Sequence, residues 1–381
     1  MASPRVLEAE GAVPVSRGGA ARLAPDDLAK LRDARRANNF DAIRLAAALS
    51  VVFSHSFLIA EGSEANEPFA RITGNQCILG LVGVFVFFII SGYLVTESYI
   101  RRPAPGRFLL RRMLRIYPGL VVNVLVCALL VGPMVSALPL GAYLASPGLR
   151  EFLVATLSLD AGPLHLPGVL FADNPVGLLV NGSRWTLRYE VMMYLMILAL
   201  AAARLLRLSS AIGLVGIGVA SVYFEQALTP FGDIGEWAWF VGFFAAGMVL
   251  SFVRERLVFD WRYALLAAAG LIGFVWLGRL IMLFPLAGAY LVIYLARRHD
   301  RWLDYSRYCG DLSYGLYIYS WPAEQLVMYL SGGRAQWWQV FFGSLGLALP
   351  AAFLSWHGVE KWALRRGRQL PARRPAVASG D

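Results

Sequence analysis

The sequence predicts an all-α, polytopic membrane protein with about ten transmembrane helices. The chain has 381 residues, of which 58% are hydrophobic and only 16% are charged. Soluble proteins carry a charge on about a quarter of their residues. Apolar runs of about twenty residues recur along the chain, and a helix of that length crosses the hydrocarbon core of a bilayer.

The basic residues orient these apolar runs in the membrane. Arginines gather in every second connecting segment, such as residues 101–115, whereas the segment 139–184 holds only Arg150 and Arg184. Cytoplasmic segments carry the excess of positive charge, so this alternation predicts ten spans with both termini cytoplasmic. A short fifth run and a nearly continuous seventh and eighth leave nine or eleven spans as alternatives. The expected spans are residues 40–60, 78–99, 117–138, 186–206, 210–225, 236–253, 262–278, 280–296, 312–331 and 338–358.

The two ends of the chain differ in composition from the apolar region. We expect residues 1–38 to form a disordered cytoplasmic tail, because they are rich in Ala, Arg, Pro and Asp and contain no apolar signal segment. Residues 39–362 would form the membrane domain, and residues 363–381 a basic cytoplasmic tail. The net charge of +10 fits this membrane orientation, and we expect no nucleic-acid partner.

The first expected span carries two ionisable residues, Arg44 and His55. Their spacing puts both on one stripe of a helix, roughly 16 Å apart along its axis. Ionisable residues inside membrane helices usually face a bundle interior or a wet cavity, so the stripe predicts a polar seam. A neutral imidazole suits general-base catalysis, and an arginine suits the anchoring of an anion. The alternative is that Arg44 reaches the headgroups and His55 lies near the far interface.

A basic cluster, RRMLR, closes the segment 101–115 and precedes the third expected span. Its arginines are Arg111, Arg112 and Arg115, and guanidinium groups at a helix start suit bidentate binding of phosphate. The alternative is that these residues only hold the segment inside the cell and attract anionic lipid.

The stretch WTLRYEVMMY opens the fourth expected span at the outer side of the membrane. Glu190 lies beside the apolar run, with Tyr194 one turn further on the same face, and Arg188 lies one turn from Trp185. A carboxylate at this depth is expected to be paired or functional. The alternative is an interfacial aromatic belt in which Glu190 is solvated. The topology puts Glu190 and His55 in the same, outer half of the membrane.

Two further stretches are expected to shape a site. Gly80, Gly83, Phe87 and Ser91 share one stripe of the second span, which predicts close helix packing and leaves room for a thin substrate arm. The outer segment 139–184 is long, apolar and rich in Pro and Gly. It would form either a re-entrant lid over a site or a surface Ω-loop.

Taken in order along the chain, these motifs resemble the bacterial membrane acyltransferase-3 family. Members of that family O-acylate O-antigen, exopolysaccharide, Nod factors and related glycans. The resemblance spans residues 39–366. It is carried by Arg44-x10-His55, GVFVFFIISGYL, RRMLRIYP, WTLRYEVMMY, LSYGLYIYSWP and the closing HGVEKW.

The resemblance implies a role for each matching residue. His55 would be the essential histidine and Arg44 its partner, and Glu190 would match the acidic residue after the Trp-Thr-Leu step. Ser320 stands where many members have a histidine, and Trp362 stands where a proline often follows Glu-Lys. Arg111, Arg112 and Arg115 would contact the phosphates of acyl-CoA, and Trp185, Arg188, Tyr194, Tyr314 and Tyr317 would contact substrates.

The resemblance therefore implies an enzyme of the bacterial inner, or cytoplasmic, membrane. It would move an acyl group, which we expect to be acetyl, from acetyl-CoA to a hydroxyl of a cell-surface or lipid-linked glycan, without a metal. His55 would act either as a general base or as the carrier of a transient acyl group. Glu190 would fix the imidazole or bind the acceptor.

The expected partners are acyl-CoA, the glycan acceptor and membrane lipids. Some relatives carry an extracytoplasmic esterase-like domain that this sequence does not show, so the membrane domain would act either alone or with a separate partner protein. The alternative function is a transporter or flippase that uses the Arg44/His55 seam. The sequence shows no internal repeat, which many transporters have, and this counts against that alternative.

Overall fold

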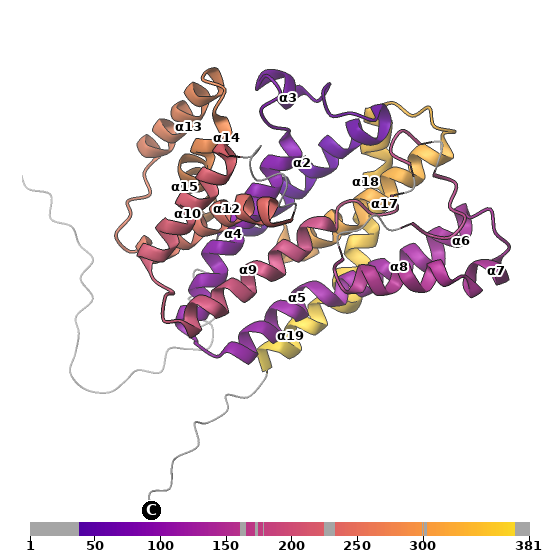
Figure 1. Ribbon diagram of the computed structural model, residues 1–381, viewed down its shortest axis with the longest axis horizontal. Coiled ribbons are helices and arrows are strands. Elements are labelled where there is room, and N and C mark those ends of the chain that lie inside the picture. Colours follow the sequence, from indigo (N-terminus) through magenta and orange to yellow (C-terminus); the bar gives the residue numbers. More distant parts are fainter. Residues whose placement is uncertain are drawn as a thin grey trace, which may run out of the picture. The chain divides into compact units, whose positions relative to one another are not determined.

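The computed structural model describes residues 38–160, 165–171, 174–177, 179–224, 233–298, 300 and 303–369, without the side chains at 233–236 and 368. Within these residues the chain is helical and contains no β-strand, which confirms the predicted all-α class (Figure 1). One isolated antiparallel bridge joins Ser136 and Val169. The chain divides into two units between Ala37 and Asn38, and the expected N-terminal tail lies outside the described residues except for Asn38.

Several helices are long and apolar enough to cross a membrane. Each of the ten ranges expected from the sequence corresponds to a helix or to a helix with a π-helical turn. The number of spans and the side on which the termini lie stay predictions. Among the described residues, six candidate spans are Phe40–Glu61, Leu79–Arg101, Pro105–Val135, Trp185–Ala202, Leu280–Arg297 and Trp337–Gly367.

A row of apolar helices forms the centre of the unit, each packed against the next (Figure 1). Their order in space differs from their order in the sequence, so residues far apart along the chain become neighbours. The row consists of α10 (Leu208–Tyr223), α12 (Asp233–Val253), α4 (Leu79–Arg101), α2 (Phe40–Glu61), α17 (Ser313–Leu330) and α18 (Trp337–Ser355).

Small residues allow the central helices to approach closely. A Cβ atom built on Gly92 of α4 would lie 1.9 Å from the carbonyl oxygen of Phe244 on α12, so the two backbones are in direct contact. Gly80 and Gly83 of α4 similarly face α2, where the amide of Gly80 donates a hydrogen bond to Ser54 Oγ at 2.7 Å. Close approach at small residues is a main source of helix association in membranes. The predicted packing role of the glycine stripe is confirmed.

The basic segment before the third span is helical rather than a loop. Helix α5 (Pro105–Val126) begins at Pro105, whose fixed φ and missing N–H suit a first helical position. The helix thus begins twelve residues before the span expected at 117–138, because arginine is a strong helix former and the apolar helix extends through the basic segment. A π-helical turn, Cys127–Val131, joins α5 to α6 (Gly132–Val135).

The end of the described chain packs against this basic helix. Helix α18 continues through a π-helical turn, Trp356–Glu360, into α19 (Lys361–Gln369), and α19 contacts α5. Residues 363–369, which were expected to belong to a C-terminal tail, are thus helical. Residues 370–381 of the expected tail lie outside the described residues.

The segment 139–184, expected at the outer side, is folded where it is described. It contains α7 (Leu140–Ala145) and α8 (Pro147–Leu157). The second half of the segment is hydrogen-bonded to Gln325 of α17. The Gln325 side chain accepts a hydrogen bond from Asn174 at 2.7 Å and donates one to the Leu179 carbonyl at 3.0 Å. The segment is thus attached to the helix that carries much of the site described below.

The remaining helices surround the central row. Helix α9 (Trp185–Ala202) contacts α4, α5 and α12, and α15 (Ala289–Arg297) contacts α2, α4 and α12. The others are α3 (Pro68–Ile72), α13 (Trp261–Trp276), α14 (Leu280–Leu283), the π-helical turn Phe284–Gly288 and α16 (Ser306–Cys309).

Candidate active site

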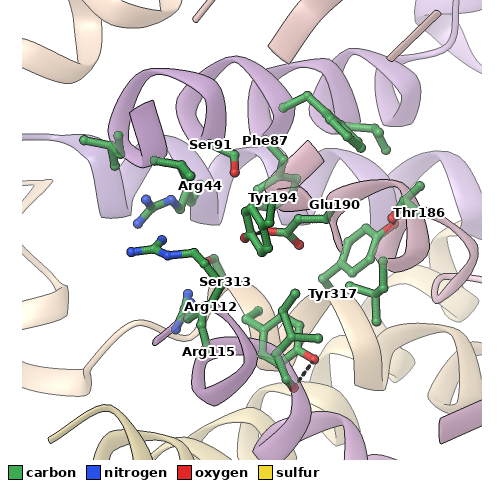
Figure 2. A pocket seen from close by; sticks show the side chains of 17 residues that line it. Arg44, Phe87, Ser91, Arg112, Arg115, Thr186, Glu190, Tyr194, Ser313 and Tyr317 are labelled. Atoms are coloured by element: carbon green, nitrogen blue, oxygen red, sulfur yellow. Dashed lines mark hydrogen bonds between the residues drawn. The ribbon is translucent and has the colours of Figure 1, made fainter. Parts of the chain in front are cut away.

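A cavity of about 330 Å³ lies between α2, α4, α5, α9 and α17 (Figure 2). Its two ends differ in chemistry. Arginine side chains gather at one end, the Thr186 and Tyr317 side chains lie at the other, and Glu190 and Tyr194 lie between them. The apolar part of the wall includes Val84, Phe87, Phe88, Leu94, Val95, Ile116 and Leu187.

Three arginines form the basic end of the cavity. Arg112 and Arg115 share a face of α5 because they are three residues apart, and Arg44 joins them from the start of α2. The guanidinium of Arg112 lies 6.0 Å from the ring centroids of Phe108 and Tyr194. In the described part of the chain its Nε is buried without a hydrogen-bond partner. This end of the cavity is suited to a phosphate group.

Asp311 holds two of the three arginines in place. Its Oδ2 lies 2.5 Å from a guanidinium nitrogen of Arg115 and 3.9 Å from one of Arg44. Its Oδ1 accepts hydrogen bonds from the backbone N–H and the hydroxyl of Ser313. Burial raises the pKa of the Asp311 carboxyl, but Arg115, Arg44 and the Ser313 hydrogen bonds outweigh burial and hold the pKa below its ordinary value. Sequence reasoning missed Asp311, although an acid directly before an apolar run is expected to have a partner.

Arg111 lies away from the cavity. It is absent from the cavity wall, and its Cγ lies 3.6 Å from the position that a Cβ on Gly367 would occupy, so its side chain faces α19. Of the three arginines, Arg112 and Arg115 line the cavity and Arg111 does not. The reason is the rotation of α5, which directs the Arg112 face toward α9 and the Arg111 face toward α19. The predicted contact of the three arginines with the phosphates of acyl-CoA stays a prediction.

Glu190 occupies the middle of the cavity wall (Figure 2). Tyr194, one turn further along α9, donates a hydrogen bond to Glu190 Oε1, as the helical spacing predicts. Arg115 is near enough to interact electrostatically with the Glu190 carboxylate, but within the described part of the chain Glu190 forms no ion pair. The Glu190 carboxylate therefore lies close to the arginine end of the cavity, yet it forms no ion pair with these arginines in the described part of the chain.

Tyr317 and Thr186 form the opposite end of the cavity. The hydroxyls of Thr186 and Tyr317 are hydrogen-bonded at 2.6 Å, and the Phe87 ring meets the Tyr317 ring edge-on with centroids 5.8 Å apart. Tyr314 also lines the cavity and donates a hydrogen bond to the Ile116 carbonyl at 2.7 Å. Of the predicted substrate contacts, Tyr194, Tyr314 and Tyr317 therefore border the cavity.

Two other predicted substrate contacts do not line this cavity. Trp185 packs against the rings of Tyr189 and Phe240, with centroid distances of 5.9 and 5.5 Å. The Arg188 guanidinium lies 5.0 Å from the centroid of the Tyr189 ring. Trp185 and Arg188, one turn apart on α9, both contact the ring of Tyr189.

His55 lies deep between α2 and α17 and outside the cavity wall. Its Nδ1 lies 3.7 Å from Oε2 of Glu324. The Glu324 side chain is 0% exposed and that of His55 is 13% exposed. Nδ1 and both Glu324 carboxylate oxygens are buried without a hydrogen-bond partner among the described residues. An approach of a few tenths of an ångström would convert this contact into a hydrogen bond.

The structure places a residue beside His55 that the sequence analysis did not name, and the catalytic roles of His55, Arg44 and Glu190 stay predictions. Glu324, not Glu190, is the carboxylate that faces the imidazole, and Arg44 pairs with Asp41 and Asp311 at the basic end of the cavity. Sequence reasoning missed Glu324, although it is the one acidic residue in the expected span 312–331 and an intramembrane acid is a functional signal. The packing of α2 against α17 could not be read from spacing within either helix.

One face of α17 connects the cavity with His55. Tyr317, Trp321 and Glu324 are spaced i, i+4 and i+7, so they share this face. Tyr317 lines the cavity, and one turn later the Trp321 ring stands edge-on to His55 with centroids 4.8 Å apart. Trp321 is itself fixed, since its Nε1 donates a hydrogen bond to the Leu179 carbonyl at 3.0 Å. A ligand that enters at the arginines and extends along α17 would point toward His55.

The positions that depart from the family pattern are also defined. Ser320 is buried, and its hydroxyl donates a hydrogen bond to the Tyr317 carbonyl at 3.4 Å. Trp362 is exposed on α19, with Arg366 stacked over its ring. Within the described residues, no group of three or more His, Cys, Asp or Glu side chains is arranged to hold a metal ion.

Comparison with known proteins gives a consistent result. The chain is 29% identical to Nodulation protein 10 of Rhizobium leguminosarum bv. viciae, over 90% of this chain and 97% of the relative. It is 24% identical to an O-acetyl transferase of Shigella phage Sf6, over 87% of this chain and 97% of the relative. No solved structure matches. The family described as Acyltransferase domain matches residues 38–357, and the chain belongs to this family, the membrane acyltransferase-3 O-acyltransferases.

Proposed function

We propose that this membrane O-acyltransferase moves an acetyl group from acetyl-CoA to a hydroxyl of a cell-surface or lipid-linked glycan. The observation that carries the proposal is the cavity with Arg44, Arg112 and Arg115 at one end, which adjoins the α17 face that bears the Glu324 partner of His55. The printed name of the phage relative, O-acetyl transferase, supports an acetyl group. The glycan acceptor is the one that the family resemblance implies. Neither the family match nor these relatives support the transporter alternative.

The shape of the cavity supports coenzyme A as the donor. Coenzyme A joins phosphates to a narrow pantetheine arm that ends in the thioester. A volume of about 330 Å³ is at the small end of ligand pockets, so it suits the arm, with the nucleotide outside at the basic face. By the positive-inside rule that basic face is cytoplasmic, where acetyl-CoA is made. The corresponding location is the bacterial inner membrane.

In the proposed reaction His55 acts as a general base. It removes the proton of the acceptor hydroxyl, the hydroxyl oxygen attacks the thioester carbonyl, a C–O bond forms and the C–S bond breaks. The proton then passes from His55 to the departing sulfur of coenzyme A. The Glu324 carboxylate, 3.7 Å from Nδ1, would stabilise the imidazolium and fix the ring. The alternative route, in which His55 carries the acetyl group itself, uses the same residues.

The experiment that tests this function uses purified protein in lipid with labelled acetyl-CoA and a glycan acceptor. Wild type is compared with His55→Ala, with Arg112→Ala/Arg115→Ala and with Arg111→Ala. We expect His55→Ala to abolish turnover but retain donor binding, and the double variant to lose donor binding.

Arg111→Ala is the matched comparison, because it removes a neighbouring guanidinium that does not line the cavity. It should bind the donor nearly as wild type does. If wild type neither binds nor turns over acetyl-CoA, the donor assignment is wrong. If His55→Ala stays active, His55 has no part in the mechanism.

A further inference from the structure

The position of Glu190 is unexpected for a site that binds only an anion. Its carboxylate lines the cavity that Arg44, Arg112 and Arg115 make basic, yet the ion pairs of Arg44 and Arg115 are made with Asp41 and Asp311. Glu190 does not neutralise these arginines within the described part of the chain. Its Oε1 accepts a hydrogen bond from Tyr194, and Oε2 accepts none from the described residues.

A negative charge at this place makes the cavity selective along its length. The arginine end of the cavity attracts an anion. The Glu190 carboxylate, which projects into the cavity between Tyr194 and Thr186, repels an anion that moves beyond the arginines. A carboxylate accepts hydrogen bonds and donates none, so the group that it selects must carry N–H or O–H donors. The cavity therefore fits a ligand with phosphate at one end and uncharged hydrogen-bond donors in its middle.

The pantetheine arm of coenzyme A has this distribution of groups. Two amide N–H groups and one hydroxyl follow the phosphates, and the apolar walls formed by Phe87, Phe88 and Leu187 suit the methylenes between them. An acyl chain of a phospholipid offers no such donors, and a free phosphate is charged throughout. Tyr194 orients the Glu190 carboxylate from the side, so that one oxygen stays open to the ligand.

We infer that Glu190 is a donor-specificity residue, which binds the amide or hydroxyl donors of the pantetheine arm and rejects ligands that are anionic throughout. The inference rests on the proposed function, since it concerns the donor of that reaction. It differs from both roles implied for Glu190 by the resemblance, which are to fix the imidazole or to bind the acceptor; the carboxylate that faces the imidazole is that of Glu324.

The test compares two probes that share the phosphates and differ in the arm. Adenosine 3′,5′-diphosphate carries the phosphates of coenzyme A without pantetheine, and coenzyme A carries both. Binding of each probe to purified protein in lipid is measured by calorimetry for wild type and Glu190→Gln. We expect the preference for coenzyme A over the diphosphate to fall about tenfold in Glu190→Gln, because a charge-assisted hydrogen bond is weakened. The diphosphate should bind equally or more tightly, because a nearby negative charge is removed.

Two further variants sharpen the result. Tyr194→Phe keeps the ring beside Arg112 and removes only the hydroxyl that orients Glu190, so the preference should fall in the same direction by a smaller factor. Glu97→Gln removes a carboxylate of α4 that is paired with Arg101 and lies outside the cavity wall, and should bind both probes as wild type does.

The outcomes separate this inference from the proposed function. An unchanged preference in Glu190→Gln overturns the inference. Equal weakening of both probes also overturns it, because Glu190 would then only support the arginines. If wild type binds neither probe, the coenzyme A donor itself is wrong, and the inference falls with it.

Discussion

Nδ1 of His55 lies 3.7 Å from Oε2 of Glu324, inside the contact of α2 with α17. Both atoms are buried, and the described residues offer neither of them a hydrogen bond. Buried polar groups are nearly always hydrogen-bonded, and the exceptions concentrate at functional sites. A histidine that faces a buried carboxylate is arranged to accept a proton and to hold the resulting charge.

We expect Glu324→Gln to remove most of the activity without removing the donor site. The amide keeps the shape of the side chain but cannot stabilise an imidazolium, so kcat should fall about 100-fold or more. The KM for acetyl-CoA should change little, because Glu324 is absent from the cavity wall. Steady-state transfer to the acceptor measures both constants. Glu61→Gln, at the exposed end of α2, is the comparison, and a kcat near wild type for Glu324→Gln would exclude the carboxylate from proton transfer.

A side chain at position 182 is expected to lower kcat, because Gly182 packs against the Trp321 ring that contacts His55. A Cβ on Gly182 would lie 2.6 Å from the Trp321 indole, whose edge meets His55 and whose Nε1 is bound by the Leu179 carbonyl. Gly182→Ala should displace the ring and the imidazole, and lower kcat about tenfold while donor binding persists. Gly148→Ala, where the nearest side-chain atom lies 3.5 Å away, should behave as wild type. A loss of donor affinity in place of kcat would contradict this positioning role.

Asp311→Asn is expected to destabilise the protein in a pH-dependent manner. The variant leaves Arg115 without its carboxylate, and unfolding should become easier by about 1–3 kcal/mol at neutral pH. Because the folded-state pKa of Asp311 is below the unfolded value, its contribution is complete above the unfolded pKa of about 3.9 and is lost as pH falls through the folded value.

Thermal unfolding in detergent at several pH values measures the Asp311 contribution. The midpoint of Asp311→Asn should lie below that of wild type from neutral pH down to about pH 4. The two midpoints should converge in stronger acid. A difference between wild type and variant that grows on acidification has the wrong sign and would reject the ion-pair explanation.

Gly92→Ala is expected to weaken the packing of α4 against α12. The added methyl would lie 1.9 Å from the Phe244 carbonyl oxygen, so the helices must separate, at a cost of about 1–3 kcal/mol. A Cβ on Gly216 of α10 meets nothing within 4 Å, and Gly216→Ala should be neutral or stabilising because alanine is the better helix former. Equal unfolding temperatures for the two variants would show that the close approach is not needed.

Helical spacing predicted well which residues share a face of one helix. The stripe of Gly80 and Gly83 packs on α2, and Tyr194 donates its hydrogen bond to Glu190 one turn earlier. Such pairs follow from the 3.6-residue period, which places residues three and four apart on one face. Arg44 and His55 share a stripe of α2 but lie about three turns apart along it. In the structure Arg44 lines the cavity, whereas His55 faces Glu324 outside the cavity wall.

The sequence by itself determined the helical class, the order of the family motifs and the chemistry available on each helix face. Only the tertiary structure decided that His55 meets Glu324 rather than Glu190, that Asp311 holds Arg44 and Arg115, and that Arg112 rather than Arg111 lines the cavity. The physical reason is that periodicity sets the face of a residue on its own helix. Which helix covers that face depends on contacts between distant segments, such as the backbone approach of Gly92 to Phe244.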